Sequence, residues 1–77
     1  MTIHEMKVKL FASLRVGRFV ERQWDYVEGM TVRRVLEELH IDMKELGVLL
    51  VNCRHVEPDY RLAEGDTLSI FPVIGGG

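Results

Sequence analysis

Apolar and polar side chains alternate in two segments near the start of the chain. Over residues 6–12 every second side chain is apolar, which predicts a half-buried strand. We expect this strand to turn Met6, Val8, Leu10 and Ala12 toward the core, and Lys7, Lys9 and Phe11 the other way. Residues 19–26 predict a second strand, with Val20, Arg22, Trp24 and Tyr26 on one face. The short break between them, residues 13–17, predicts a hairpin.

The apolar spacing then changes to that of a helix. Thr31 is a good N-cap because its hydroxyl can accept a hydrogen bond from a free amide of the first turn. The apolar residues that follow recur at helical spacing and predict one amphipathic helix: Val32, Val35, Leu36 and Leu39. A looser helical turn is expected over residues 42–46, ended by Gly47.

The last third of the chain again reads as strands. Residues 48–52 predict a buried strand, residues 52–54 a tight turn, and residues 55–56 a short extended piece. The last predicted strand is 67–71, and Pro72 cannot donate a hydrogen bond to a neighbouring strand. One amphipathic helix and one sheet with a single apolar face indicate a two-layer α+β domain.

Composition narrows the functional classes. A chain of 77 residues with a net charge of −2 fits one soluble domain. The longest aliphatic run, residues 48–51, is far too short to span a membrane, and no basic stripe interleaved with aromatics indicates nucleic acid. The single cysteine, Cys53, suits a reducing compartment, and residues 1–5 do not resemble a signal peptide. We therefore expect a cytoplasmic protein that binds neither membrane nor nucleic acid.

Three glycines, Gly75, Gly76 and Gly77, follow the apolar pair Val73-Ile74. Glycine has no side chain, so such a tail stays mobile and can thread a channel too narrow for other residues. From Pro72, five extended residues reach roughly 16–18 Å, enough to bring a terminal carboxylate into the active site of a partner. The alternative is a frayed end without function.

Three short motifs resemble a known family. Residues 11–15 read Phe-Ala-Ser-Leu-Arg, Leu62 precedes Glu-Gly-Asp at 64–66, and residues 70–73 read Ile-Phe-Pro-Val before the glycines. In this order and spacing they resemble the small subunit of molybdopterin synthase and, more broadly, the MoaD/ThiS group of ubiquitin-like sulfur carriers. The resemblance implies a β-grasp domain over 1–72, with a mixed sheet of four to five strands and one helix on one face, and a flexible tail over 73–77.

The resemblance also implies a carrier and not an enzyme. A ubiquitin-activating-type enzyme would use ATP and magnesium to adenylate the carboxylate of Gly77, and sulfur would then replace AMP to give a thiocarboxylate. The large subunit of molybdopterin synthase, or an equivalent acceptor, would receive the sulfur. The alternatives are a sulfur carrier for the thiazole of thiamine, a ubiquitin-like protein modifier and a plain interaction module. The family often has Phe-Pro-Pro where this chain has Phe71-Pro72-Val73. The pair Val73-Ile74 is closer to the thiamine carrier, whereas the opening motif and the length favour the pterin branch.

Two aromatic residues are candidates for partner binding. Phe11 and Phe71 fall on the face opposite the core, and the implied fold makes their strands neighbours, so the rings would form an exposed apolar patch. We expect Pro72, Val73 and Ile74 to extend this patch and His55 to lie near it. The alternative is that each ring folds over a sheet edge. The three histidines are too scattered to predict a metal site, and Cys53 has no evident activating base.

Basic residues outnumber acidic ones early in the chain. Residues 7–22 contain one acidic residue, Glu21, and five basic residues: Lys7, Lys9, Arg15, Arg18 and Arg22. This run predicts either an ordinary solvated surface or a weak steering patch for an acidic partner.

Overall fold

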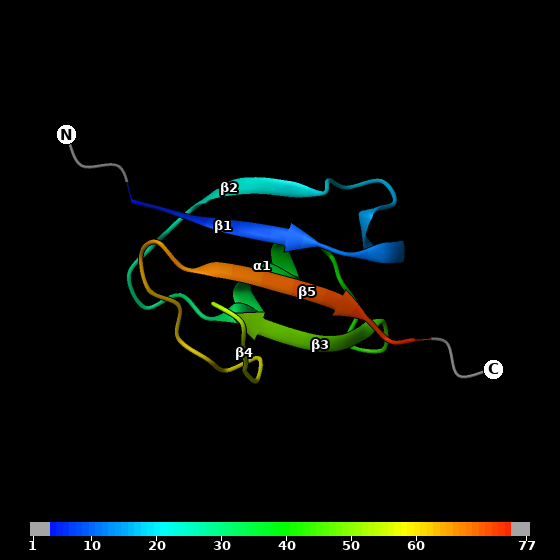
Figure 1. The fold of residues 1–77 in the computed structure, drawn as a ribbon. Helices are drawn as coiled ribbons and strands as arrows, with labels where there is room; N and C mark the ends of the chain where they lie inside the picture. The colour runs from blue at the N-terminus through cyan, green and yellow to red at the C-terminus, as the bar shows by residue number, and fades with distance from the viewer. Residues whose placement is uncertain (1–3, 75–77) are drawn as a thin grey trace.

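Strands β1 (Glu5–Leu10) and β5 (Thr67–Pro72) run parallel at the centre of one five-stranded sheet in the computed structural model, which describes residues 4–74. The sheet has the order β2-β1-β5-β3-β4 and its other pairs are antiparallel (Figure 1). The remaining strands are β2 (Glu21–Asp25), β3 (Leu46–Val51) and β4 (Arg54–His55). The expected mixed sheet with a first and last strand side by side is confirmed.

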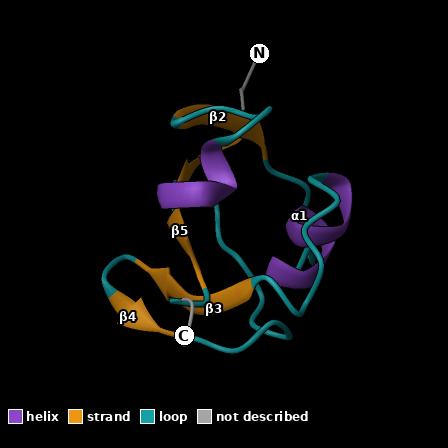
Figure 2. Ribbon diagram, turned by 90° about the vertical axis from the view of Figure 1, so that its right-hand side faces the viewer, coloured by secondary structure: helices purple, strands orange, loops and turns teal. Residues whose placement is uncertain are grey.

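Helix α1 (Val32–Glu38) covers one face of this sheet (Figure 2). Thr31 is its N-cap: the backbone is extended there, and Oγ1 accepts a hydrogen bond from the Arg34 amide at 3.4 Å. The apolar stripe of the helix is buried against the inward side chains of β1, β3 and β5, as its spacing predicted. Within residues 4–74 no helix is both long and apolar enough to cross a bilayer.

The C-terminus of α1 ends without a glycine. His40 takes a left-handed conformation, with φ of 58°, and its amide donates to the Glu37 carbonyl while the Ile41 amide donates to the Leu36 carbonyl. These two bonds make a Schellman motif, which satisfies carbonyls that the helix leaves open. Arg18 donates from its guanidinium to the carbonyls of Leu39 and His40, so the β1–β2 connection holds this helix end.

Three boundary expectations were wrong. Ala12 does not continue β1 inward: it takes a φ of 52°, is exposed, and begins a 3-10 turn, η1 (Ala12–Arg15), which buries Leu14. The second strand begins at Glu21, because residues 16–20 form the loop from η1. Residues 42–46 do form a loose helical turn, with amide hydrogen bonds from Glu45 to Asp42 and from Leu46 to Met43, but Gly47 does not end it and lies inside β3.

The tight turn predicted after Val51 joins β3 to β4. Asn52 and Cys53 both have positive φ, 51° and 70°, and Val51 pairs with Arg54. A two-residue loop with both φ values positive is the type I′ turn that fits the twist of a hairpin. The Asn52 side chain donates to Asp66 and accepts from the Thr67 amide, so the hairpin turn is joined to the start of β5.

Candidate functional site: an apolar groove at the end of the central strands

The groove is built around two aromatic rings. The Phe11 and Phe71 rings are stacked, with centroids 4.1 Å apart and an interplanar angle of 9°. Phe11 directly follows β1 and Phe71 lies near the end of β5, and the Phe11 amide donates to the Ile70 carbonyl. Parallel pairing of the two central strands therefore brings the predicted residues together, on the face opposite α1. The rings are half-buried and meet each other, so neither folds over a sheet edge.

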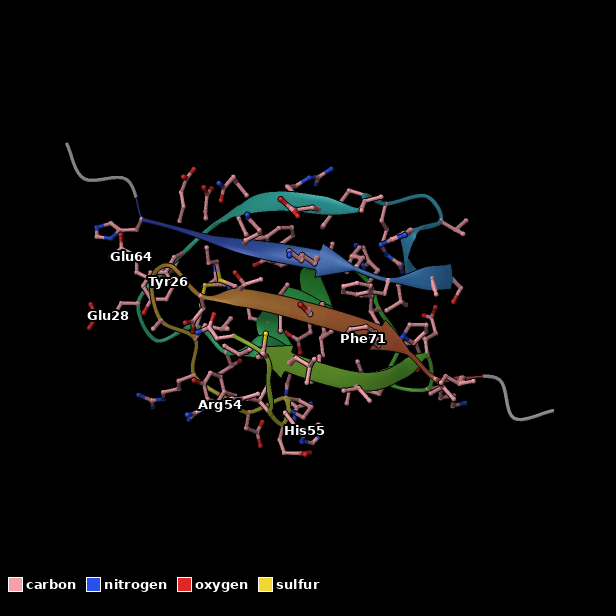
Figure 3. All side chains as sticks on the ribbon, viewed as in Figure 1. Tyr26, Glu28, Arg54, His55, Glu64 and Phe71 are labelled. Atoms are coloured by element: carbon pink, nitrogen blue, oxygen red, sulfur yellow. The ribbon has the colours of Figure 1, made fainter. Side chains whose placement is uncertain are left out.

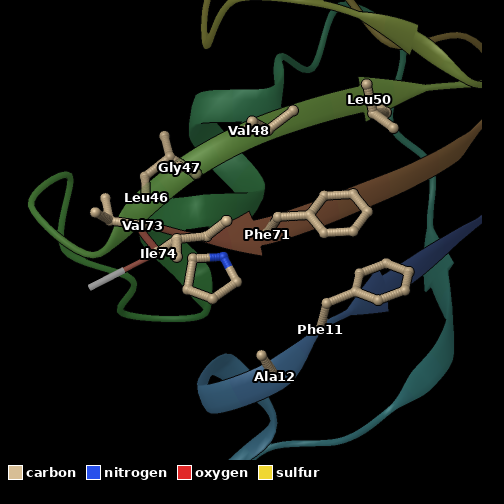
Figure 4. Close-up of a pocket in the computed structure, with 10 residues that line it drawn as sticks. Phe11, Ala12, Leu46, Gly47, Val48, Leu50, Phe71, Val73 and Ile74 are labelled. Atoms are coloured by element: carbon tan, nitrogen blue, oxygen red, sulfur yellow. The ribbon is translucent and has the colours of Figure 1, made fainter. Parts of the chain in front are cut away.

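Apolar residues of β3 and the tail complete the groove (Figure 4). Besides the two rings, its lining includes Leu46, Val48, Leu50, Pro72, Val73 and Ile74. The sequence indicated Pro72, Val73 and Ile74, but Val48 and Leu50 were read as part of a buried strand. Val48 is 42% exposed and Leu50 is half-buried. The sequence did contain a signal for these two residues. It predicts one helix, which can cover only one face of the sheet, so alternate residues of an all-apolar strand must point to the uncovered face.

The described part of the tail is held at its first residue and exposed at its second. The Val73 amide donates to the Glu45 carbonyl at 2.8 Å, and its side chain is 52% exposed. Ile74 is 91% exposed. An isoleucine so exposed beside an apolar groove is typical of a surface that a partner covers. Gly75, Gly76 and Gly77, the predicted reactive and threading residues, lie outside the described residues.

His55 lies beside the groove without lining it. It is directly opposite Leu50 in the β3–β4 pair, so its side chain shares the groove face. Its Nδ1 is 3.8 Å from the Glu57 carboxylate, and the side chain is 62% exposed. Figure 3 shows Arg54 and His55 at the β4 edge, with Glu64 at the opposite end of the sheet from Phe71.

Most of the early basic residues have partners within the chain. Lys7 lies 3.4 Å from Glu21, and Arg22 lies over the Phe19 ring, 4.3 Å from its centroid. Arg18 donates to three backbone carbonyls. Arg15 donates from Nε to the Leu10 carbonyl at 2.7 Å. Its guanidinium also lies 5.4 Å from the Phe11 centroid, which places a positive charge at the groove margin.

The polar side chains that could take part in chemistry are dispersed among the described residues. Within residues 4–74 no group of three histidine, cysteine or acidic side chains is arranged to hold a metal ion. Cys53 is exposed in its turn. The buried carboxylate of Asp66 is engaged by the Asn52 side chain and the Ala63 amide, both at 2.8 Å.

A family model described as the ThiS family matches residues 8–77. Among solved structures, a Pyrococcus furiosus protein described as molybdopterin converting factor, subunit 1, is 28% identical, with a TM-score of 0.73 over 90% of this chain and 97% of that one. SAMP1 from Haloferax volcanii is 26% identical, with a TM-score of 0.73 over 95% and 99% of the two chains. Urm1 from Trypanosoma brucei, at 18% identity and a TM-score of 0.70 over the full length of both chains, shares the fold.

These matches confirm the ubiquitin-like β-grasp fold, a fold shared by small sulfur carriers and protein modifiers. A five-stranded mixed sheet with one helix on one face is what the sequence resemblance implied.

Proposed function

The chain belongs to the ThiS family, and from this premise we propose that it is a sulfur carrier whose Gly77 carboxylate is converted to a thiocarboxylate. The observation that supports this most directly is the continuity of the groove with the tail. The stacked Phe11 and Phe71 rings and the exposed Val73 and Ile74 form one apolar surface, which ends where the three glycines of the sequence begin.

The reaction needs an activated carboxylate, because a free carboxylate is a poor electrophile. A carboxylate oxygen of Gly77 attacks the α-phosphorus of ATP, which releases pyrophosphate and leaves an acyl-adenylate. Sulfide then attacks the carbonyl carbon and AMP departs, so the products are a thiocarboxylate, AMP and a proton. ATP and magnesium are bound by the activating enzyme, and the carrier takes part as a co-substrate. Its sulfur is a better nucleophile than the oxygen it replaces, so it can be delivered to an acceptor.

The groove supplies the recognition that this chemistry requires. An adenylating enzyme of the ubiquitin-activating type would cover Phe11, Phe71 and the β3 residues, with Val73 and Ile74 entering its active-site channel. Aromatic anchors in the centre of an apolar patch commonly supply most of the binding energy of an interface. The same face would be presented in turn to a sulfur acceptor such as the large subunit of molybdopterin synthase, so the two complexes would exclude each other.

Of the two sulfur pathways, we propose that the carrier serves the synthesis of molybdopterin. The Pyrococcus protein described as a molybdopterin converting factor is similar over almost the whole of both chains, and the Phe-Ala-Ser-Leu-Arg motif includes Phe11 of the groove. A thiazole carrier remains the second sulfur pathway. The similarity to SAMP1, a small archaeal modifier protein, favours a second function, conjugation through the same glycine to lysines of other proteins. Both functions begin with the same acyl-adenylate.

Reconstitution tests the proposal. The full chain is incubated with ATP, magnesium, sulfide and the adenylating enzyme of the same organism, and its intact mass is measured. We expect one oxygen to be replaced by sulfur at Gly77, and no change in a variant that lacks Gly76 and Gly77. An enzyme that adenylates another carrier but leaves this one unchanged would overturn the proposal. An isopeptide bond to lysine, formed without sulfur, would favour the modifier function.

A further inference from the structure

Strand β3 approaches the end of β5 so closely at Gly47 that no side chain can fit. An added Cβ there would lie 2.4 Å from the Pro72 oxygen, 2.7 Å from the Pro72 carbonyl carbon and 3.0 Å from the Val73 nitrogen. All three are backbone atoms, which cannot turn aside as a flexible side chain would. The φ of Gly47 is not in the left-handed region, so the requirement for glycine here is steric and not conformational.

The same point interrupts the ladder between β3 and β5. Leu46 pairs with Pro72 and Val48 with Phe71, so Gly47 is the extra residue of a bulge. Bulges re-aim the chain locally and are frequent next to functional sites. This one lies between Phe71, which belongs to the groove, and Val73, where the tail leaves the sheet.

Besides Gly47, a compact turn over residues 42–45 contacts the start of the tail. The acceptor of the Val73 amide is the carbonyl of Glu45, and the Glu45 amide donates back to the Asp42 carbonyl at 2.8 Å. The side chains brace the turn: the Lys44 amide donates to Asp42 Oδ1 at 2.8 Å, and the Asp42 amide donates to Glu45 Oε2 at 3.1 Å. The chain is therefore held up to Val73, and the next residue, Ile74, is almost fully exposed.

This hydrogen bond exists because residue 73 is not a proline. Proline has no amide hydrogen and fixes its own φ, so a Phe-Pro-Pro sequence would restrain the tail through the ring. Val73 supplies a donor, and the carbonyl of Glu45 accepts from it.

We propose that the Gly47 bulge and the Asp42–Glu45 turn position the tail, by fixing the direction in which the chain leaves the sheet beside the groove. This inference rests on the proposed function. Once a partner covers Phe11 and Phe71, the direction at Val73 decides whether the terminal carboxylate reaches the reacting phosphorus. Gly47 is a positioning residue, because it touches neither ATP nor the partner's reacting atoms and acts through the backbone of Pro72 and Val73.

The proposal predicts different effects on kcat and on KM. Misplacing a reacting group by about 1 Å can lower a rate on the order of 100-fold. Gly47→Ala adds only one methyl group to the groove lining and keeps both stacked rings, so docking should change much less. In ATP–pyrophosphate exchange with the adenylating enzyme of the same organism, we expect Gly47→Ala to lower kcat about 10- to 100-fold with KM changed less than about threefold. Phe71→Ala should instead raise KM.

Two further variants control for stability. Gly29→Ala adds a strained Cβ in a turn where nothing lies within 4 Å, so it lowers stability and should leave kcat unchanged. Asp42→Ala removes one brace of the turn from an exposed position and should lower kcat several-fold without unfolding the chain. If Gly47→Ala does not fold, Asp42→Ala decides the question.

A measurement without any enzyme separates this inference from the proposed function. Hydrogen exchange of the Val73 amide, followed by NMR on the full chain, should be at least about 10-fold faster in Gly47→Ala or Asp42→Ala than in the original chain. A wild-type chain that is never adenylated would overturn the proposed function, while the amide exchange would still show whether these residues hold the tail. Unchanged Val73 exchange, or a Gly47→Ala variant that alters KM alone, would overturn the positioning role.

Discussion

The rings of Phe11 and Phe71 stack within 4.1 Å of each other although they come from opposite ends of the chain. Only the parallel pairing of β1 with β5 makes this possible, since it places the ends of the first and last strands side by side. The groove is therefore a product of the completed fold, and no part of the chain contains it alone.

Removing one of the two rings should weaken docking far more than it weakens the fold. Phe71→Ala truncates a central aromatic of the groove, so we expect affinity for the adenylating enzyme to fall about 30-fold, or about 2 kcal/mol. Isothermal titration calorimetry would measure this. Tyr60→Ala is the matched control, because Tyr60 is 42% exposed and lies outside the groove. Equal losses for the two variants would contradict a docking role for the groove.

Asp66 should be the most sensitive acidic residue for stability. It is 8% exposed, and its two oxygens accept from the Asn52 side chain and the Ala63 amide. Asp66→Ala leaves both donors unpaired, so we expect the free energy of unfolding in urea to fall by about 2–4 kcal/mol. Asp59→Ala is the comparison: its ion pair with Arg33 is exposed, and its loss should cost less than about 1 kcal/mol. Similar values for the two would refute this account of the turn network.

Replacing Cys53 by glycine should stabilise the protein. Cys53 occupies a left-handed position of the β3–β4 turn, with φ of 70°, where a Cβ is unfavourable and glycine is not. We expect Cys53→Gly to raise the free energy of unfolding by about 0.5–1 kcal/mol. Cys53→Ala keeps the Cβ and should change it by only a few tenths of a kcal/mol. A larger gain from alanine than from glycine would show that the thiol, and not the backbone, is unfavourable there.

Arginine at position 18 should not be replaceable by lysine. The Arg18 guanidinium donates to the carbonyls of Leu14, Leu39 and His40 and so joins η1 to the end of α1. An ammonium cannot span three carbonyls in this way. We expect Arg18→Ala to lower the unfolding free energy by about 1–2 kcal/mol, and Arg18→Lys to recover less than half of that loss. Full recovery by lysine would mean that charge at the helix end suffices.

The sequence correctly predicted the elements in which apolar residues recur at a single regular spacing, helical or strand-like. The stripe from Val32 to Leu39 and the alternation from Met6 to Leu10 face one core, so period and burial agree. Ala12 has the right period and the wrong conformation, because the chain turns there to bury Leu14. Apolar alternation says nothing of where a strand stops pairing, and neighbouring strands decide that.

The candidate site was only partly predictable for a similar reason. Phe11 and Phe71 could be predicted from the sequence because each is an apolar residue on the polar side of its strand. Val48 and Leu50 were not, because a run of apolar residues has no marked face until the sheet around it is known. Gly47 was read as the end of a helical turn, since its close contact with Pro72 arises from strand pairing far along the chain.

The intact mass of the natural protein, purified from its own cells, tests the central claim most directly. The account predicts that Gly77 is the last residue and that a fraction of molecules has one carboxylate oxygen replaced by sulfur. A persulfide on Cys53 would add a whole sulfur atom and is removed in Cys53→Ala, which separates the two modifications. A terminal residue other than glycine, or a Gly77 found only as free carboxylate or joined to lysines while the cells actively make sulfur-containing cofactors, would contradict the account.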